Sequence, residues 1–168
     1  GIPGVGIQGL LTRHFLKTRL RSSQKSWAFL TQAASSVSER RGWQENLRAL
    51  GYRVEQTRTG YVLRSNQEPV AVMHAYADHS MFSHVITDQG SLPEGLVLAE
   101  CAHYGAAWGI LSTPRRVRLF QTDPPAGSAT GRYLELDLKT LGPDDKPYAA
   151  LLAPDCLRRG GRLQAWIE

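Results

Sequence analysis

The feature that most constrains the fold is a compact apolar run in the middle of the chain, residues 69–76. Such a run, bounded by polar segments, predicts a strand buried in a sheet. Tyr52-Arg53-Val54 and Tyr61-Val62-Leu63 precede it and predict two short strands, with a turn near Thr59-Gly60. Further strands are predicted at 108–111, 117–120 and 133–137. The sheet therefore occupies the middle and later parts of the chain.

Helical periodicity fills most of the first third. Residues 10–21 have the spacing of a basic amphipathic helix, and Ser22 or Ser23 can cap the next helix. Ser38 is predicted to cap a third helix, with Glu39 in its first turn and Gly51 after its end. Pro93 is predicted to open a helix that ends at Gly105, and a short helix is predicted around 147–152. This order predicts an α/β (α+β) fold, a mixed sheet flanked by helices with an N-terminal helical segment.

The length of 168 residues suits a single core. We divide the chain into a basic helical segment, residues 1–37, and an α/β domain, residues 38–168. The start lacks methionine and the end is apolar, so we expect the domain to be a fragment of a longer chain. Two cysteines suit free buried thiols in a reducing cytosol, which predicts a cytoplasmic protein. No apolar run reaches the roughly 18 residues of a membrane helix, so no membrane partner is expected.

Positive charge is concentrated at the beginning of the chain. Residues 1–60 hold ten Lys or Arg and three Asp or Glu, whereas residues 61–168 hold ten and twelve. A basic half attracts polyanions, and nucleic acid is the commonest such partner, although a solvated helix surface explains the charge as well. The residues predicted to contact DNA are Arg13, Lys17, Arg19, Arg21, Lys25, Arg40 and Arg41.

Two local motifs carry little weight. The glycines at 4, 6 and 9 match G-x-G-x-x-G, but no predicted strand delivers them to a helix, so a flexible leader is the preferred interpretation. His74, Asp78 and His79 have side chains that suit a transition metal, but their spacing is irregular and a polar loop explains them better. No metal site is therefore predicted in this segment.

The strand, strand, helix and hairpin pattern resembles a known family. The pattern consists of Tyr61-Val62-Leu63, then residues 69–76, then a helix, then Trp108-Gly109-Ile110-Leu111-Ser112-Thr113-Pro114-Arg115-Arg116-Val117-Arg118-Leu119-Phe120. This pattern is similar to the N-terminal nuclease-like domain of large restriction–modification proteins. These are the fused type IIG enzymes, their methyltransferase relatives and the type I motor subunits, whose domain has the PD-(D/E)xK nuclease shape. The turn Leu47-Arg48-Ala49-Leu50-Gly51-Tyr52 also resembles this family, and the resemblance covers about residues 38–140.

The resemblance implies an active site whose residues are replaced in this chain. In an active member, acidic residues hold Mg²⁺ at the scissile phosphate and a lysine assists the attacking water or stabilises developing charge. The aspartate position falls on Gly60, the glutamate position on His74 and the lysine position on Tyr76. Glycine cannot bind a metal and tyrosine carries no positive charge, so catalytic activity is not expected at these positions.

The leading hypothesis is a catalytically degenerate nuclease-fold module of a restriction–modification-type DNA methyltransferase, which contacts DNA or docks onto downstream domains of the same chain. We expect no cofactor in this domain; the resemblance implies S-adenosylmethionine in the parent protein. One alternative is a divergent endonuclease that uses Mg²⁺ or another metal through His74, Asp78 and Glu68. A second alternative is a protein-interaction domain without affinity for DNA.

Overall fold

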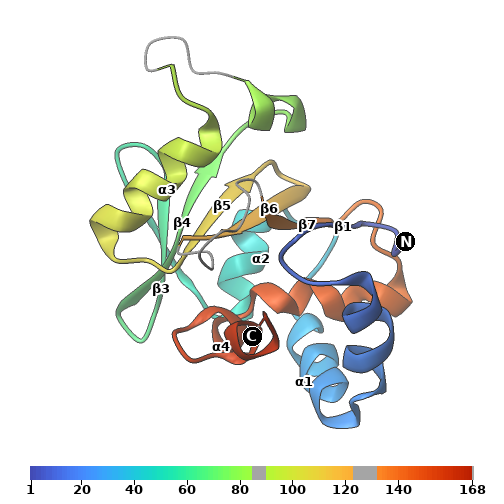
Figure 1. Cartoon of the computed structure of the whole chain (residues 1–168). Coiled ribbons are helices and arrows are strands. Elements are labelled where there is room, and N and C mark those ends of the chain that lie inside the picture. Colours follow the sequence, from blue (N-terminus) through green and yellow to red (C-terminus); the bar gives the residue numbers. More distant parts are fainter. Residues whose placement is uncertain (85–89, 123–131, 168) are drawn as a thin grey trace.

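A computed structural model of the 168-residue chain describes residues 1–84, 90–122 and 132–167. Its centre is a seven-stranded sheet in the order β1-β7-β6-β5-β4-β3-β2 (Figure 1). The strands are β1 (Val5–Gln8), β2 (Arg53–Gln56), β3 (Tyr61–Ser65), β4 (Glu68–Ala75), β5 (Trp108–Ser112), β6 (Arg116–Gln121) and β7 (Tyr133–Asp137). Neighbouring strands are antiparallel except β4 and β5, which are parallel.

Helices cover both faces of this sheet, which confirms the predicted mixed α/β fold. The helical elements are η1 (Phe15–Leu20, a π-helix), α1 (Gln24–Ala34), α2 (Trp43–Leu50), η2 (His79–Ser83, a 3₁₀ helix), α3 (Pro93–Tyr104), η3 (Pro143–Leu152, a 3₁₀ helix), α4 (Pro154–Leu157) and α5 (Arg162–Ile167). None of the described helices has both the length and the apolar character needed to cross a membrane.

The two faces of the sheet have separate cores. On the α1 face, which η1, α1, α2, η3, α4 and α5 cover, the core includes Met73, Ile110 and Leu119. On the α3 face, which α3 and η2 cover, it includes Val72 and Leu111. Successive residues of a strand point to opposite faces, so Met73 and Val72 belong to different cores. Each side chain of β4 is therefore assigned to one face by its position.

Helix α3 makes the crossover between the parallel strands β4 and β5. Its first residue is Pro93, whose fixed φ and missing N–H suit the first turn of a helix. Gly105 ends it at φ 72° and ψ 25°, a left-handed conformation that favours glycine. Both signals confirm the predicted bounds. The crossover places the exit of β4 and the beginning of β5 under one helix.

The first residues do not form the predicted flexible leader. Val5–Gln8 is a strand, β1, whose Val5 and Ile7 lie opposite Leu136 and Leu134 of β7. The leader prediction was wrong because the pairing partner lies about 130 residues further along the chain, beyond any local pattern. Gly4 is required by the turn before β1: at φ 82°, a Cβ there would lie 2.6 Å from the Leu141 backbone nitrogen.

The third helix begins later than predicted. Gly42, and not Ser38, is the N-cap residue of α2, so Glu39 lies outside the helix. The Ser38 hydroxyl instead accepts a hydrogen bond from the Arg40 backbone N–H within a loop. The 3₁₀ helix η3 likewise begins before the predicted residue 147. The loop predicted at 122–131 lies outside the described residues except for Thr122.

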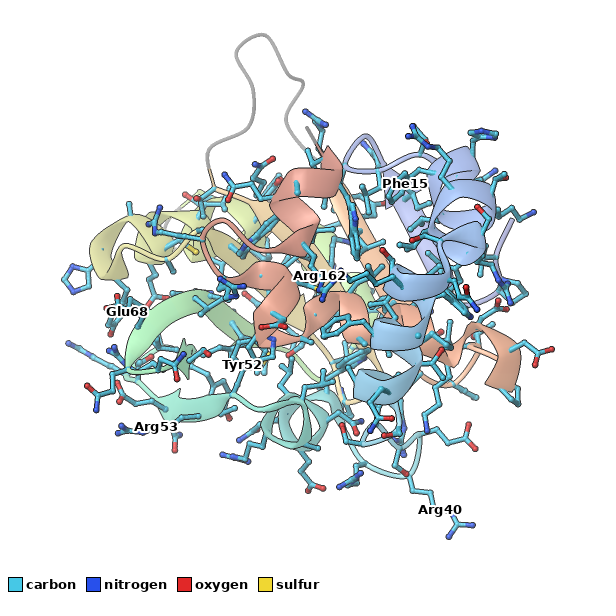
Figure 2. All side chains as sticks on the ribbon, turned by 90° about the horizontal axis from the view of Figure 1, so that it is seen from below. Phe15, Arg40, Tyr52, Arg53, Glu68 and Arg162 are labelled. Carbon is cyan, nitrogen blue, oxygen red and sulfur yellow. The ribbon has the colours of Figure 1, made fainter. Side chains whose placement is uncertain are left out.

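The N-terminal segment shares a core with the remainder of the chain. Leu16, Leu20 and Leu30 are fully buried in the cluster that also contains Tyr148 of η3. The Tyr148 hydroxyl donates a 2.7 Å hydrogen bond to the Leu16 carbonyl, which joins η3 to η1. Figure 2 looks onto this helical layer, where Arg162 of α5 lies beside α1. Its guanidinium is 4.0 Å from the centre of the Phe29 ring.

Candidate functional site

Two of the three positions to which the resemblance assigns catalytic residues, Gly60 and His74, are in direct contact. Gly60 precedes β3, and the antiparallel register that pairs Tyr61 with Met73 places Gly60 beside His74 near the end of β4. A Cβ on Gly60 would overlap the Met73 carbonyl oxygen and would lie 2.7 Å from the His74 ring. No larger residue fits there while the backbone and the imidazole keep these positions.

His74 is buried on the α3 face and binds a helix. It is 7% exposed, and its Nε2 is in hydrogen-bond contact with the carboxylate of Glu100 on α3. The other oxygen of Glu100 accepts a hydrogen bond from the Thr59 hydroxyl, and Thr59 precedes Gly60 in the β2–β3 turn. Thr59, Gly60, His74 and Glu100 form a closed group that we call the polar ring.

Glu100 was not among the residues predicted for the site. It lies 26 residues after His74 and reaches it only because α3 crosses over β4. The one available signal is its position beside Cys101, which belongs to the buried side of α3. Glu100 itself is partly buried, and a partly desolvated carboxylate is stabilised by a hydrogen-bond donor.

Tyr76 lies just beyond the polar ring. Its backbone N–H donates to the Ser112 carbonyl at 2.7 Å, which continues the β4–β5 pairing by one residue. Its ring packs edge-on against Phe82 of η2, with centroids 6.1 Å apart. Burial raises the pKa of the Tyr76 phenol above its ordinary value, and the negative charge of Glu100 adds to the rise. The phenol is therefore neutral at physiological pH and cannot replace an ammonium group.

The residues of the alternative metal site are not assembled. Glu68 begins β4 and His74 is six residues later, which separates them by roughly 20 Å along the strand. Asp78 caps η2 by accepting the Ser80 N–H at 3.0 Å, and this hydrogen bond lowers the pKa of the Asp78 carboxyl. Within the described residues, no group of three His, Cys, Asp or Glu side chains could hold a metal ion. These side chains do not fit the magnesium site of an active nuclease.

His79 belongs to a different network on the α3 face. Its Nε2 lies 3.3 Å from Glu135 of β7, and Glu135 accepts from Arg118 at 2.8 Å and from Arg116 at 3.3 Å. Arg116 also pairs with Asp137 at 3.2 Å. Two arginines and two carboxylates balance one another here, so Arg116 and Arg118 are ion-paired across β6 and β7.

The residues predicted to contact DNA lie on elements of the α1 face. Six of the seven are exposed cations for which we find no ion pair within the described part of the chain: Arg13, Lys17, Arg19, Lys25, Arg40 and Arg41. Arg41 donates to the Ser36 carbonyl at 2.6 Å. Arg40 projects from the edge of the molecule in Figure 2.

Arg21 differs from the other predicted DNA contacts because it stabilises the fold. Its guanidinium pairs with Asp145 at 2.9 Å and donates to the Asp144 carbonyl at 3.2 Å. It also lies 4.9 Å from the centre of the Trp27 ring, a cation–π distance. Arg21 therefore links the end of η1 to α1 and to the beginning of η3.

The exposed cations and the polar ring lie on opposite sides of the sheet. His74 faces α3, whereas the elements that carry the cations pack on the α1 face. A polyanion held by η1 and α1 would therefore be separated from the polar ring by the thickness of the sheet.

Comparison of the chain with protein-family models, with curated proteins and with solved structures finds no significant match.

Proposed function

We propose that this chain is a catalytically degenerate nuclease-fold module of a restriction–modification-type DNA methyltransferase, and that it contacts DNA through the basic helices of its N-terminal segment. Under this proposal the parent protein is cytoplasmic, uses S-adenosylmethionine in another domain, and docks this module onto downstream parts of the same chain.

The observation that carries the proposal is the polar ring. The order β3, β4, α3 and the β5–β6 hairpin is the order on which the family resemblance rests. At the two positions where that resemblance implies metal ligands, Gly60 has no side chain and His74 is held by Glu100 of α3. The Glu100 carboxylate is engaged by both His74 and Thr59. This arrangement supports a nuclease scaffold without its catalytic centre.

The charge distribution supports the DNA-contact role. Arg13, Lys17 and Arg19 lie on one helical element, η1, or immediately before it, and all three are exposed. Cations that neutralise phosphates release condensed counterions, which makes binding strong at low salt and steeply salt-dependent.

DNA binding is tested by fluorescence anisotropy of a labelled duplex across a range of salt concentrations. The duplex is long enough to reach all of the predicted DNA contacts. The variant R13Q/K17Q/R19Q should reduce the slope of log affinity against log salt by about three units. The control R48Q/R53Q/R58Q removes the same charge from exposed residues of α2 and the β2–β3 hairpin, and should leave the slope unchanged. Absence of binding by the unaltered chain at low salt, or equal losses in both variants, would refute the DNA-contact role.

Catalytic silence is tested separately with supercoiled plasmid and Mg²⁺ or Mn²⁺. The plasmid should stay intact with the unaltered chain. Cleavage that the His74→Ala variant abolishes would establish an active divergent nuclease instead. The two assays are independent, because a module without catalysis can still bind DNA.

A further inference from the structure

A hollow of about 510 Å³ opens beside the predicted DNA contacts. One wall is the loop before α2, with Arg40 and Arg41, and the other is the beginning of η3, with Lys146. Val37, Leu138, Leu141 and Pro143 supply its apolar lining. Such a hollow suits one nucleotide unit of DNA. Its apolar lining residues can contact the sugar, and its cations can bind the anionic phosphate.

The loop that carries Arg40 and Arg41 is fixed by hydrogen bonds from the buried side chain of Asn46. Asn46, which is 0% exposed, accepts from the Ser38 N–H at 2.9 Å and donates to the Ser38 and Arg41 carbonyls at 2.9 and 3.1 Å. Arg115 adds bonds to the carbonyls of Glu39 and Arg41. These hydrogen bonds fix the backbone of the loop, so binding of an anion orders only the side chains of its cations.

The charges around the hollow favour an anion. Three cations, Arg40, Arg41 and Lys146, line it together with one carboxylate, Glu39. Asp144 and Asp145 adjoin Lys146 in sequence, but neither lines the hollow, and Asp145 is paired with Arg21. The ion pair with Arg21 neutralises Asp145, which is next to Lys146 in sequence. The charged residues that line the hollow therefore have a net positive charge.

We propose that this hollow binds a phosphodiester group of the DNA backbone, with Lys146 and Arg40 as its cations from opposite walls. The inference rests on the proposed DNA-contact role and extends it, because it adds Lys146 from the C-terminal half and fixes where a strand crosses the α1 side of the molecule.

The test compares K146Q with K139Q in the same anisotropy assay. Lys139 is an exposed lysine seven residues earlier that does not line the hollow, so K139Q is a charge-matched control. K146Q and R40Q should each lower the salt slope by about one unit, and K146Q/R40Q by about two, whereas K139Q should leave it unchanged. Thermal unfolding of each variant checks that the fold is intact.

The outcomes separate this inference from the proposed function. No binding by the unaltered chain would overturn both. Binding that R13Q/K17Q/R19Q weakens, with K146Q indistinguishable from K139Q, would overturn the phosphate site alone. A loss confined to K146Q and R40Q would support the site and would assign the contact to the hollow instead of η1.

Discussion

At the scale of single residues, Gly60 is a glycine because the Met73 backbone and the His74 ring occupy the space that a Cβ atom would need. Its φ does not lie in the left-handed range, so glycine is not required there by backbone conformation. It is required by space, because a Cβ would overlap the Met73 carbonyl oxygen and would lie 2.7 Å from the His74 ring. An aspartate at position 60 cannot coexist with this arrangement. An acidic side chain introduced there would need changes in β4 as well.

The substitution Gly60→Ala should therefore destabilise the protein by about 2 kcal/mol, since β3 and β4 must separate to admit a methyl group. Gly95→Ala is the matched control: Gly95 lies in α3, an added methyl group there would meet nothing within 4 Å, and the change should gain about 0.5 kcal/mol of helix propensity. Urea unfolding of both variants measures the difference. Equal stabilities would contradict the close packing of Gly60 against β4.

The two cysteines give a prediction about alkaline pH. Burial raises the pKa of the Cys101 and Cys156 thiols to about 12, against an ordinary 9.0. Between about pH 9 and pH 12 the unfolded chain loses these protons while the folded chain keeps them, so stability falls as pH rises. The variant C101A/C156A should show a shallower decline in its unfolding midpoint across this window. A decline as steep as that of the unaltered chain would refute the thiol contribution.

At the scale of elements, local signals predicted six of the seven described strands and missed the edge strand β1. The bounds of β4, β5 and α3 agree with prediction because apolar runs, Pro93 and Gly105 act within a few residues. β1 was missed because a glycine-rich strand becomes regular only when β7 pairs with it. The pairing of His74 with Glu100 was missed for a similar reason, since it depends on how α3 crosses the sheet.

The loop before α2 is an element whose conformation depends on one buried amide. Asn46→Ala removes three hydrogen bonds and leaves the Ser38 N–H without its partner, which should cost about 3 kcal/mol. Gln44→Ala, at a half-buried position of the same helix, should cost under about 1 kcal/mol. Hydrogen exchange should show loss of protection at the Ser38 amide in the Asn46 variant only. Retained protection there would contradict the anchoring role of Asn46.

At the scale of the whole molecule, the sheet separates two surfaces that the sequence could not relate. The basic residues, Gly60 and His74 can all be read from the sequence, but no local pattern indicates that the basic residues and His74 belong to opposite faces. The assignment follows from the register of β4, where Met73 and His74 are neighbours with side chains on different sides. If η1 contacts DNA as proposed, the bound DNA and the polar ring lie on opposite faces of the sheet.

The boundary predicted after residue 37 is tested by removing residues 1–37. This change deletes β1 and takes Leu16, Leu20 and Leu30 out of the shared core, and each buried leucine contributes about 1.5–3 kcal/mol. Since a domain has only about 5–15 kcal/mol of net stability, residues 38–168 alone should lack a cooperative thermal transition and should bind a hydrophobic dye. Removing residues 1–9 deletes β1 but keeps those three leucines, so that shorter deletion should lower the midpoint while preserving the transition. A cooperative thermal unfolding of residues 38–168 near the original midpoint would instead make residues 1–37 a separable segment. The core of residues 38–168 would then be stable without the three buried leucines.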